Sequence, residues 1–458
     1  MARKHSFDYD LIVIGSGAGG SAAATIAAKA GSKVAIIESD TFGGDSPNFS
    51  DIPTKALLHA AQLYDEAKHG SRFGLRTNTL GYNYPSLRAW KDLAVKRTGA
   101  GGNKRFYETH GITAIQGRAH FLSPHEITVN RRHLSAAQFI VATGASWTVP
   151  SVQGIEKIAY LTPRTILENI RPPKSLFIIG GGQTGVELAQ LMAIFGTKVY
   201  IGEIASRLLP KLDQEVGELM ERLLHEQKGV TTLTQSRVVA VQKDGLGKRI
   251  TYSRGGVEKH VHVDDVLIAT GRTPEVDLGL ENATVTYSKK GIAVNEFLQT
   301  SVKHIYAAGD VLGNEDATTY TALLESRTIA HNLNAKTQIR PDYDAAPQLI
   351  FTHPGIAQVG LSEDDCARRA LDVTTASAPL SIIARSNTSD FYDGFVKLIT
   401  DKKGVLLGAT VVAPHASEII HELTLAVKHR LTASQIAETP HGFLSWSEAV
   451  RVAASKLA

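Results

Sequence analysis

A glycine pattern that occurs twice at a constant separation constrains the fold of this chain more than any other feature. Residues 9–38 contain an apolar stretch, a glycine-rich turn, an alanine-rich stretch and a second apolar stretch that ends in an acidic residue, and residues 175–203 repeat this order. Corresponding positions lie 165 residues apart, and they are Gly15 and Gly180, Gly17 and Gly182, Gly20 and Gly185, and Glu38 and Glu203. The pattern predicts two strand–helix–strand units, each at the start of a Rossmann-like α/β domain.

Each residue of the pattern has a physical role in a dinucleotide-binding turn. The first glycine permits the tight turn, the second lets a pyrophosphate approach the backbone, and the third lets helix and strand pack closely. The helix N-terminus faces the phosphates, and the glutamate accepts hydrogen bonds from a ribose. Two units predict two dinucleotides, which we interpret as FAD held by the first unit and a nicotinamide that visits the second. The alternative is that the second turn is a structural relic.

Glu203 also bears on the choice of nicotinamide. A carboxylate accepts a hydrogen bond from a free 2′-hydroxyl but repels a 2′-phosphate, whose binding sites usually offer arginine or lysine. NAD(H) is therefore favoured over NADP(H), although Arg207 lies close to Glu203 in the sequence.

Composition excludes several other functions. With 43% hydrophobic and 21% charged residues the chain is typical of a globular enzyme. Its 49 basic and 45 acidic residues leave a net charge of +4, which gives no support to a nucleic acid or an anionic membrane as partner. The single cysteine, Cys366, cannot form an intrachain disulfide or a thiolate metal cluster, and no metal site is predicted. Residues 1–10 lack the apolar run of a targeting segment and no stretch of 18 apolar residues occurs, so we expect a cytoplasmic protein without a transmembrane segment.

Three further segments look like parts of nucleotide domains. Residues 141–144 and 268–271 are short apolar strands that each run into a glycine, as the last strand of such a domain does. Residues 305–311 form another apolar strand, and Asp310 near its carboxyl end could hold a ribityl hydroxyl group.

A helix is expected after this strand. Thr318 and Thr319 are plausible caps of a helix that runs toward Leu333, and its N-terminal dipole could stabilise negative charge on a reduced flavin. From about Pro341 the sequence becomes rich in strands, with a helix-forming stretch over residues 416–428. This region lacks a glycine-rich phosphate loop, so we assign it to association or to completing a site.

With one more motif, Thr-His-Pro at residues 352–354, the set resembles a known family. The two glycine units, the paired Ala-Thr-Gly motifs, the Gly-Asp strand and this motif are similar to those of the class I pyridine nucleotide-disulfide oxidoreductases, which include dihydrolipoamide dehydrogenase, glutathione reductase and mercuric reductase. The resemblance spans residues 8–448 and implies FAD, a nicotinamide and a homodimer whose C-terminal domain completes the partner's active site. The domains that it implies are 1–149 and 276–340 for FAD, 150–275 for NAD(P)H, and 341–458 for α+β dimerisation.

The same resemblance implies the cofactor-binding residues. They are Gly15, Gly17, Gly20, Glu38, Gly44, Lys55, Gly117, Thr143, Gly144, Asp310, Ala322, Gly180, Gly182, Gly185, Glu203, Val238 and Gly271.

The resemblance fails at the redox centre. The family's redox segment has the form GGxCxxxxC[IV]PSK, and it corresponds here to residues 43–55. Ser46 stands at the outer, substrate-exchanging cysteine position, and Asp51 stands at the inner position, which lies against the flavin in the family. Without either thiol, reduction of lipoamide, glutathione or other disulfides by the family's mechanism is not expected.

The family's C-terminal acid-base motif has also changed. Its form is HPxxSE, whereas the chain reads FLSWSE, so Phe443 replaces the histidine while Glu448 remains. His441, two residues too early, is either an ordinary loop histidine or a substitute base. The losses are consistent with one another, because without a dithiol there is no thiolate for a histidine to protonate.

The other half of the machinery is retained. Lys55 matches the family's lysine beside the flavin N5 atom, and Glu187 matches the glutamate that pairs with it near the nicotinamide. Such a pair places a fixed charge at the flavin edge and organises hydride transfer. The catalytic candidates are Lys55, Glu187, Asp51 and Ser46.

Asp51 lies four residues before Lys55 in a helix-forming segment, so the two could face each other across one turn. A carboxylate here would oppose negative charge on the reduced flavin, and burial would raise its pKa. Asp51 is therefore predicted to lower the flavin potential or to relay a proton at N5, unless it is a neutral survivor of a lost cysteine. Cys366 lies among acidic residues at a predicted helix start and is expected to be structural.

The predicted function is that of an FAD-dependent NAD(P)H oxidoreductase that passes electrons from the reduced flavin directly to a small acceptor such as a quinone or another electrophile. Related family members that lack the full dithiol set act as quinone reductases. The alternatives are pyridine-nucleotide transhydrogenation, which Glu203 disfavours, and a non-catalytic role as a flavin-binding sensor or complex subunit.

Overall fold

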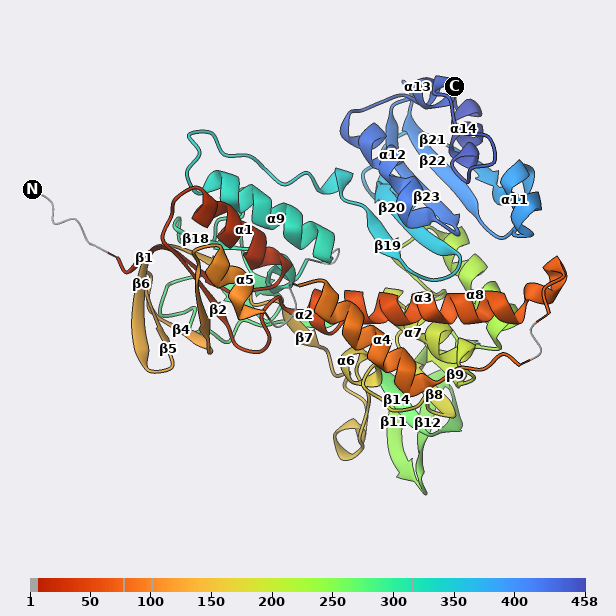
Figure 1. Ribbon diagram of the computed structural model, residues 1–458, viewed down its shortest axis with the longest axis horizontal. Coiled ribbons are helices and arrows are strands. Elements are labelled where there is room, and N and C mark those ends of the chain that lie inside the picture. Colours follow the sequence, from red (N-terminus) through yellow and green to blue (C-terminus); the bar gives the residue numbers. More distant parts are fainter. Residues whose placement is uncertain (1–6, 77–78, 100–102, 315–316) are drawn as a thin grey trace, which may run out of the picture. The chain divides into compact units, whose positions relative to one another are not determined.

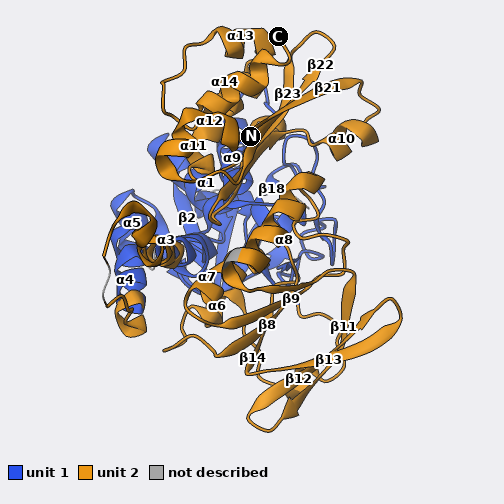
Figure 2. Ribbon diagram, turned by 90° about the vertical axis from the view of Figure 1, so that its right-hand side faces the viewer, with its two compact units in different colours: residues 1–56, 88–148, 271–342 blue, residues 57–87, 149–270, 343–458 orange. Residues whose placement is uncertain are grey.

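The computed structural model describes residues 7–76, 79–99, 103–314 and 317–458. The chain forms two compact units, each assembled from three segments (Figure 2). Unit 1 comprises residues 1–56, 88–148 and 271–342, and unit 2 comprises residues 57–87, 149–270 and 343–458. Part of the N-terminal stretch in which no targeting segment is expected, residues 1–6, lies outside the described residues.

A mainly parallel sheet forms the core of unit 1 (Figure 1). Its strands follow in the order β3-β2-β1-β6-β5-β4, and β18 pairs with β6. The apolar residues of β1 (Tyr9–Ile14) are buried, as is usual for a parallel strand covered on both faces. The other strands are β2 (Val34–Glu38), β3 (Thr113–Gln116), β4 (Ala119–Ser123), β5 (Glu126–Val129), β6 (Arg132–Val141) and β18 (Ile305–Ala307), with the small pairs β7 (Ala145–Trp147) with β15 (Arg272–Pro274) and β16 (Tyr287–Ser288) with β17 (Gly291–Ile292).

Two helices of unit 1 lie side by side (Figure 1). Helix α1 (Ala18–Lys29) follows the first glycine turn, and α9 (Thr319–Asn332) is the helix expected before Leu333. Thr318 caps α9, since its side chain accepts a hydrogen bond from the Thr321 N–H. The remaining helical segments that begin or lie in unit 1 are α2 (Asp45–Asn48), α3 (Asp51–Lys68), α5 (Lys104–Thr109) and the 3-10 turn η3 (Gly309–Leu312).

Unit 2 repeats the parallel arrangement. Its strands follow in the order β10-β9-β8-β14 and are all parallel, and α7 (Gln183–Ile194) follows the second glycine turn. The elements of this half are α4 (Tyr84–Arg97), which continues into unit 1, α6 (Pro163–Ile166), β8 (Ser175–Ile179), β9 (Lys198–Gly202), α8 (Gln214–Lys228), β10 (Thr231–Leu233) and β14 (Asp265–Ile268), with the antiparallel strands β11 (Ser236–Asp244), β12 (Gly247–Arg254) and β13 (Val257–Val263) and the 3-10 turns η1 (Gly70–Phe73) and η2 (Ile155–Lys157). The repeated strand–turn–helix–strand order confirms the predicted pair of Rossmann-like folds.

The C-terminal part of unit 2 is an antiparallel sheet in the order β19-β20-β23-β22-β21, with helices packed on it (Figure 1). Its elements are η4 (Tyr343–Ala345), β19 (Gln348–Ile350), β20 (Gly355–Gly360), α10 (Glu363–Arg368), β21 (Val373–Pro379), η5 (Leu380–Ile382), α11 (Ala384–Ser389), β22 (Phe395–Asp401), β23 (Leu406–Ala413), α12 (Ala416–Lys428), α13 (Ala433–Glu438) and α14 (Glu448–Ser455). This is the α+β domain expected after Pro341.

A buried ion cluster joins this sheet to the nucleotide-binding half of unit 2. The Lys397 side chain is 4% exposed and its ammonium lies 3.3 Å from Asp213, 3.0 Å from Glu215 and in contact with Glu363. Although burial lowers it, the pKa of Lys397 is raised by its hydrogen bonds to Glu363 and Glu215. The cluster therefore holds α8, α10 and β22 together through charge-assisted bonds.

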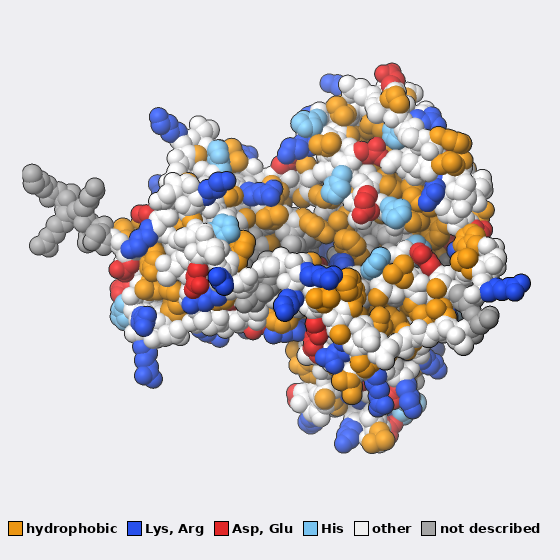
Figure 3. All heavy atoms as spheres, in the orientation of Figure 1, with side chains coloured by type: hydrophobic (Ala, Val, Ile, Leu, Met, Phe, Trp, Pro, Cys, Tyr) orange, Lys and Arg blue, Asp and Glu red, His pale blue; other side chains and the backbone are white. Residues whose placement is uncertain are grey.

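Lys and Arg side chains are spread over the face seen in Figure 3, with sparser Asp and Glu side chains among them. In the part of the chain that the structure describes, no helix combines the length and the hydropathy needed to cross a membrane.

Candidate functional site

The glycine turns of the two units have the same backbone geometry. Gly15 has a φ of +101° and Gly180 has a φ of +112°. A Cβ atom would lie 2.1 Å from a backbone carbonyl oxygen at Gly15 and 2.4 Å from one at Gly180. A Cβ atom on Gly20 would lie 2.1 Å from the Gly15 oxygen, and one on Gly185 would lie 2.1 Å from the Gly180 oxygen. Both turns therefore require glycine at these positions, which supports the role assigned to each.

The terminal glutamates also repeat their hydrogen bonds. Glu38 accepts from the Ser16 N–H at 3.0 Å and from the Asp40 N–H at 2.8 Å, and it binds the Ser16 hydroxyl as well. In unit 2, Glu203 accepts the matching bonds from the Gly181 N–H at 2.7 Å and from the Ala205 N–H at 2.8 Å. Each residue in these bonds lies 165 positions after its counterpart in unit 1. The repeat seen in the sequence thus extends to side-chain geometry.

The residues at both helix N-termini fit a phosphate group. The N-caps of α1 and α7 are Gly17 and Gly182, and among the described residues no side chain caps either helix and no acidic residue lies in either first turn. A Cβ atom on Gly182 would meet no described atom within 4 Å, and one on Gly17 would meet only Gly44 Cα at 3.9 Å. The space beside both N-cap glycines is therefore clear, as close approach of a pyrophosphate to a helix N-terminus requires.

Other predicted FAD residues gather around the first unit. The Gly117 N–H donates to the Glu38 carbonyl at 2.7 Å, which places Gly117 beside the predicted ribose site. The Thr143 hydroxyl donates to the Glu275 carbonyl at 2.7 Å, and the Glu275 N–H donates to the Gly144 carbonyl. A Cβ atom on Gly44 would lie 2.7 Å from Gly17 Cα, so this loop passes close to the glycine turn.

The remaining predicted cofactor residues have the following positions. Ala322 is buried in α9, and its Cβ atom would lie 3.4 Å from a Cβ atom on Gly309, the residue before Asp310. Val238 is buried beside Gly202, the residue before Glu203. Gly271 has a φ of +96° and accepts a hydrogen bond from the Thr148 N–H.

A hydrogen bond joins the two positions at which the family carries its redox cysteines. Ser46 in α2 donates its hydroxyl to Asp51 Oδ2 at 2.7 Å, and Asp51 begins α3. Lys55, one turn further along α3, donates to Asp51 Oδ1 at 3.2 Å, as the i,i+4 spacing predicts. The Thr319 hydroxyl donates to Asp51 Oδ2 at 2.7 Å. Sequence reasoning proposed Thr319 as a helix cap and missed this contact.

These donors determine the charge of Asp51. Burial alone would raise the pKa of this carboxyl group, but the Lys55 charge and the hydrogen bonds from Ser46, Thr319 and Lys55 outweigh it and lower the pKa. All three donors favour the ionised form. Asp51 is therefore an anion at neutral pH, and its side chain is 37% exposed.

A second charge cluster in unit 1 was also missed. Arg272 contacts Asp45, the residue before Ser46, and its Nε lies 3.4 Å from Asp310 Oδ2. The Arg272 guanidinium stacks over the Trp147 ring at 5.0 Å from the centroid. Burial raises the pKa of Asp310. The charge of Arg272 lowers this pKa, whereas the nearby carboxylates of Asp45 and Asp51 raise it further. The only sequence signal for this cluster was the arginine directly after Gly271.

Glu187 lies in α7 of unit 2 and is 3% exposed. Its carboxylate accepts a hydrogen bond from the Phe351 N–H at 2.8 Å, which ties α7 to the segment after β19. Lys55 belongs to unit 1 and Glu187 to unit 2, and their pairing stays a prediction.

The C-terminal motif exposes Phe443, which stands at the position of the family's histidine. Phe443 is 76% exposed, whereas the His441 side chain is 4% exposed. His441 Nδ1 donates to the Thr439 carbonyl at 2.8 Å, and Nε2 lies 3.2 Å from Glu422. Nδ1 is hydrogen-bonded and Nε2 faces Glu422 inside the domain, which favours the interpretation of His441 as an ordinary loop histidine. Glu448 begins α14.

Cys366 is 1% exposed in α10, where it packs against Leu361 and Ile399. Burial raises the pKa of its thiol, and the neighbouring Asp365 carboxylate adds to this. An apolar, protonated thiol of this kind is unreactive, in agreement with a structural role.

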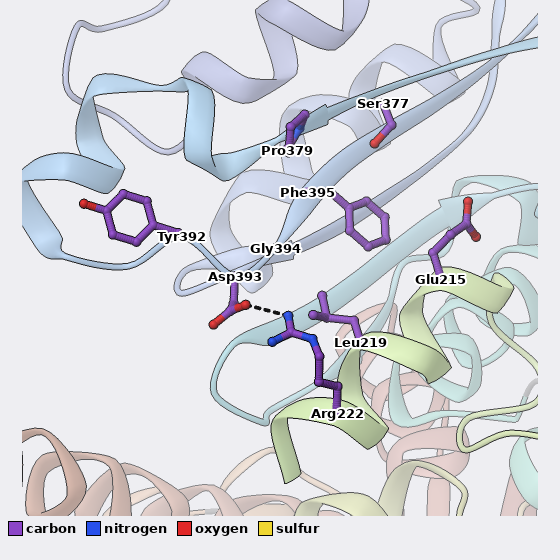
Figure 4. A pocket seen from close by; sticks show the side chains of 9 residues that line it. All are labelled: Glu215, Leu219, Arg222, Ser377, Pro379, Tyr392, Asp393, Gly394 and Phe395. Atoms are coloured by element: carbon purple, nitrogen blue, oxygen red, sulfur yellow. Dashed lines mark hydrogen bonds and ion pairs between the residues drawn. The ribbon is translucent and has the colours of Figure 1, made fainter. Parts of the chain in front are cut away.

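Unit 2 also has a surface pocket of about 370 Å³ between α8 and the C-terminal sheet (Figure 4). Its walls include Leu219 and Phe395, and Arg222 and Asp393 form an ion pair of 2.6 Å at its edge. None of the predicted site residues lines this pocket in the described part of the chain.

Comparison with known proteins agrees with this geometry. The family model "Pyridine nucleotide-disulphide oxidoreductase" matches residues 9–336, and the model of its dimerisation domain matches residues 346–454. A mercuric reductase of Lysinibacillus sphaericus is 35% identical over 451 residues, which cover 98% of this chain and 82% of that protein. A dihydrolipoyl dehydrogenase of Thermus scotoductus is 34% identical over 454 residues, which cover 98% of this chain and 97% of that protein.

Among solved structures, the HOCl-induced flavoprotein disulfide reductase RclA of Escherichia coli superposes with a TM-score of 0.86 and 27% sequence identity, covering 98% of this chain and 99% of that chain. The chain therefore belongs to the pyridine nucleotide-disulphide oxidoreductases, a family that binds FAD and NAD(P)H, and its single cysteine excludes a redox-active pair within the chain.

Proposed function

We propose that this protein is an FAD-dependent NADH oxidoreductase that passes electrons directly to a non-disulfide acceptor such as a quinone or another small electrophile. Bound FAD supplies the chemistry that takes a hydride from NADH and returns two electrons to the acceptor. For a quinone the overall reaction oxidises NADH to NAD⁺ and reduces the quinone to its dihydroxy form, with one proton taken from water. The observation that carries the proposal is the hydrogen bond between Ser46 and Asp51, oxygen-bearing residues at the two thiol positions.

Ser46 and Asp51 offer no sulfur through which electrons could pass. The chain's one thiol, Cys366, is buried in α10 and has a raised pKa, so it is a poor substitute. The residues for the preceding step are retained, because Lys55 contacts Asp51 and Glu187 is buried on the helix that follows the second glycine turn. An acceptor that takes electrons without a dithiol fits this combination.

NADH is the favoured reductant. Glu203 at the end of β9 offers carboxylate oxygens to a ribose 2′-hydroxyl and would repel a 2′-phosphate. Arg207 donates to the carbonyls of Pro210 and Leu212 at 3.3 and 3.2 Å and lies 3.4 Å from Asp364. Since these three partners all hold the Nη2 atom against the chain, Arg207 is a weak candidate for binding a phosphate.

Asp51 has an electrostatic role in this proposal. Its lowered pKa keeps it ionised at neutral pH, which disfavours donation of a proton and favours the effect of its fixed charge. A carboxylate near the flavin makes reduction less favourable and lowers the midpoint potential. We also propose that the protein is a homodimer, because the matching dimerisation model covers residues 346–454.

Anaerobic rapid mixing of the FAD-loaded protein with NADH tests the proposal. We expect fast loss of flavin absorbance, recovery on addition of menadione or benzoquinone, and slower reduction with NADPH. Lipoamide and dithionitrobenzoate should be poor oxidants. Substantial turnover of lipoamide would contradict the proposal, and failure of NADH to reduce the flavin would instead favour a non-catalytic flavin-binding role.

The role of Asp51 is tested by the midpoint potential. Asp51→Asn removes the charge but keeps the size of the side chain, so the flavin midpoint should rise. Asp277→Asn is the matched control in unit 1, because Asp277 is 85% exposed and pairs with the exposed Arg118. Equal potentials in all three proteins would remove the electrostatic role.

A further inference from the structure

The two charge clusters of unit 1 lie on the same short segment and act on each other. Residues 45–51 carry Asp45, Ser46 and Asp51, of which Asp45 binds Arg272 and Asp51 binds Lys55. Asp310 lies 3.4 Å from the Arg272 Nε. Burial raises the pKa of Asp310, and the charges of Asp45 and Asp51 raise it further, so the three carboxylates share one electrostatic environment.

Among these carboxylates, Asp51 carries the negative charge that bears on an acceptor, because its lowered pKa keeps it ionised, whereas the pKa of Asp310 is raised. A small molecule bound beside Ser46 would lie close to the charge of Asp51, because the Oδ2 atom of Asp51 lies 2.7 Å from the Ser46 hydroxyl. Its two hydroxyl donors and the Lys55 ammonium hold the ionised carboxylate in place, and its side chain is partly exposed.

We infer that this site selects its electron acceptor by charge, taking neutral or cationic acceptors and discriminating against anionic ones, with Asp51 as the specificity-determining residue. The inference rests on the proposed function, since it concerns the acceptor that approaches through the position of Ser46. Both oxygen-bearing side chains are partly exposed, so the field of Asp51 reaches that position.

The expected effect follows from Coulomb's law. An acceptor anion about 6 Å from one carboxylate, in a partly exposed site with an effective dielectric constant of about 40, is disfavoured by about tenfold, which corresponds to about 1.4 kcal/mol. Salt screens such an interaction, because the Debye length falls from about 10 Å at 0.1 M to about 3 Å at 1 M. The discrimination should therefore weaken as the ionic strength rises.

The first experiment compares two acceptors of similar size on the FAD-loaded protein, namely neutral 1,4-naphthoquinone and anionic 1,4-naphthoquinone-2-sulfonate. The quantity measured is the ratio of their kcat/KM values with NADH as reductant. Differences in intrinsic reactivity cancel when this ratio is compared between proteins. We expect Asp51→Asn to improve the relative use of the anion by about tenfold, mainly through KM, while Asp277→Asn leaves the ratio unchanged.

The second experiment needs no turnover. Binding of redox-inert 2-naphthalenesulfonate and 2-naphthylmethylammonium to the oxidised, FAD-loaded protein is measured by calorimetry at low and high salt. The cation should bind more tightly than the anion in the native protein, and the difference should shrink in 1 M salt. Because this measurement uses the native protein, it decides the question even if Asp51→Asn fails to retain flavin.

An anion/neutral ratio that stays the same in Asp51→Asn, or equal binding of the two naphthalenes at low salt, would overturn the inference while leaving direct transfer to an acceptor intact. Failure of every acceptor to reoxidise the flavin would instead overturn the proposed function. A loss of discrimination in Asp277→Asn equal to that in Asp51→Asn would show that the net charge of the protein, and not this site, is responsible, and would also overturn the inference.

Discussion

Replacing Ser46 and Asp51 by cysteine should create a disulfide in the folded chain. Their side chains already meet, since Ser46 Oγ lies 2.7 Å from Asp51 Oδ2. The double substitution Ser46→Cys and Asp51→Cys is made together with Cys366→Ala, because the thiol of Cys366 would otherwise exchange with the new pair in the unfolded chain. We expect the new pair to oxidise in air in the folded protein.

The size of the effect follows from the length of the loop. Cross-linking a chain over about six residues lowers the entropy of the unfolded state by an amount equivalent to about 2 kcal/mol at 25 °C. In the folded protein the hydrogen bond between positions 46 and 51 shows that the ends are already together. At about 1.4 kcal/mol for each factor of ten, the disulfide should form about thirtyfold more favourably in the folded protein than in the unfolded one.

The assay equilibrates the variant with glutathione buffers of graded composition, once under native conditions and once in concentrated urea. Rapid alkylation and mass spectrometry then give the oxidised fraction, and the ratio of the two equilibrium constants is the predicted thirtyfold. The variant with Ser46→Cys and Cys366→Ala alone is the control for mixed disulfides with glutathione. Equal constants in the folded and unfolded protein would refute the conclusion that the two side chains are held next to each other.

Three further predictions concern other parts of the structure. Lys397→Met leaves the buried carboxylate of Asp213 without its cation and should cost about 3–5 kcal/mol, seen as faster native-state hydrogen exchange in β22. Because the folded-state pKa of Lys397 is raised, its contribution to stability persists through neutral pH and is lost only in alkali above the ordinary value of 10.5. Thr319→Val removes a hydrogen-bond donor from Asp51 and should raise the pKa of Asp51. A plot of the flavin midpoint potential against pH should then show the titration of Asp51 at higher pH. The control Thr318→Ala removes a helix cap, so it should cost about 1 kcal/mol of stability and leave that titration unchanged. Cys366 should resist iodoacetamide in the native protein and react once urea exposes it, and rapid native labelling would contradict its burial and raised pKa.

The sequence predicted those features that depend on neighbouring residues. The glycine turns follow from local backbone geometry, because a side chain at Gly15 or Gly180 would collide with a carbonyl group. The contact of Asp51 with Lys55 follows from the helix period, since residues four apart share one face. The fold class and both cofactors could be inferred from such local patterns alone.

The features that the sequence did not reveal join residues far apart in the chain. Thr319 reaches Asp51 over 268 positions, and Arg272 reaches Asp45 over 227 positions. Neither contact leaves a periodic or spaced pattern, because the topology of the sheet in unit 1 brings the segments together. His441 shows the same limitation, since its spacing in the C-terminal motif gave no sign that Glu422 in α12 would engage its ring.

The link between Ser46 and Asp51 differs from a disulfide in what can break it. Opening a disulfide consumes two electrons, so its state follows the thiol potential of its surroundings, whereas a hydrogen bond to a carboxylate responds to protonation or to a competing donor. Peroxide and hypochlorous acid convert exposed thiolates to sulfenic and sulfinic acids, a route that a hydroxyl and a carboxylate do not follow. We therefore expect this centre to keep its composition under oxidants that modify exposed thiolates.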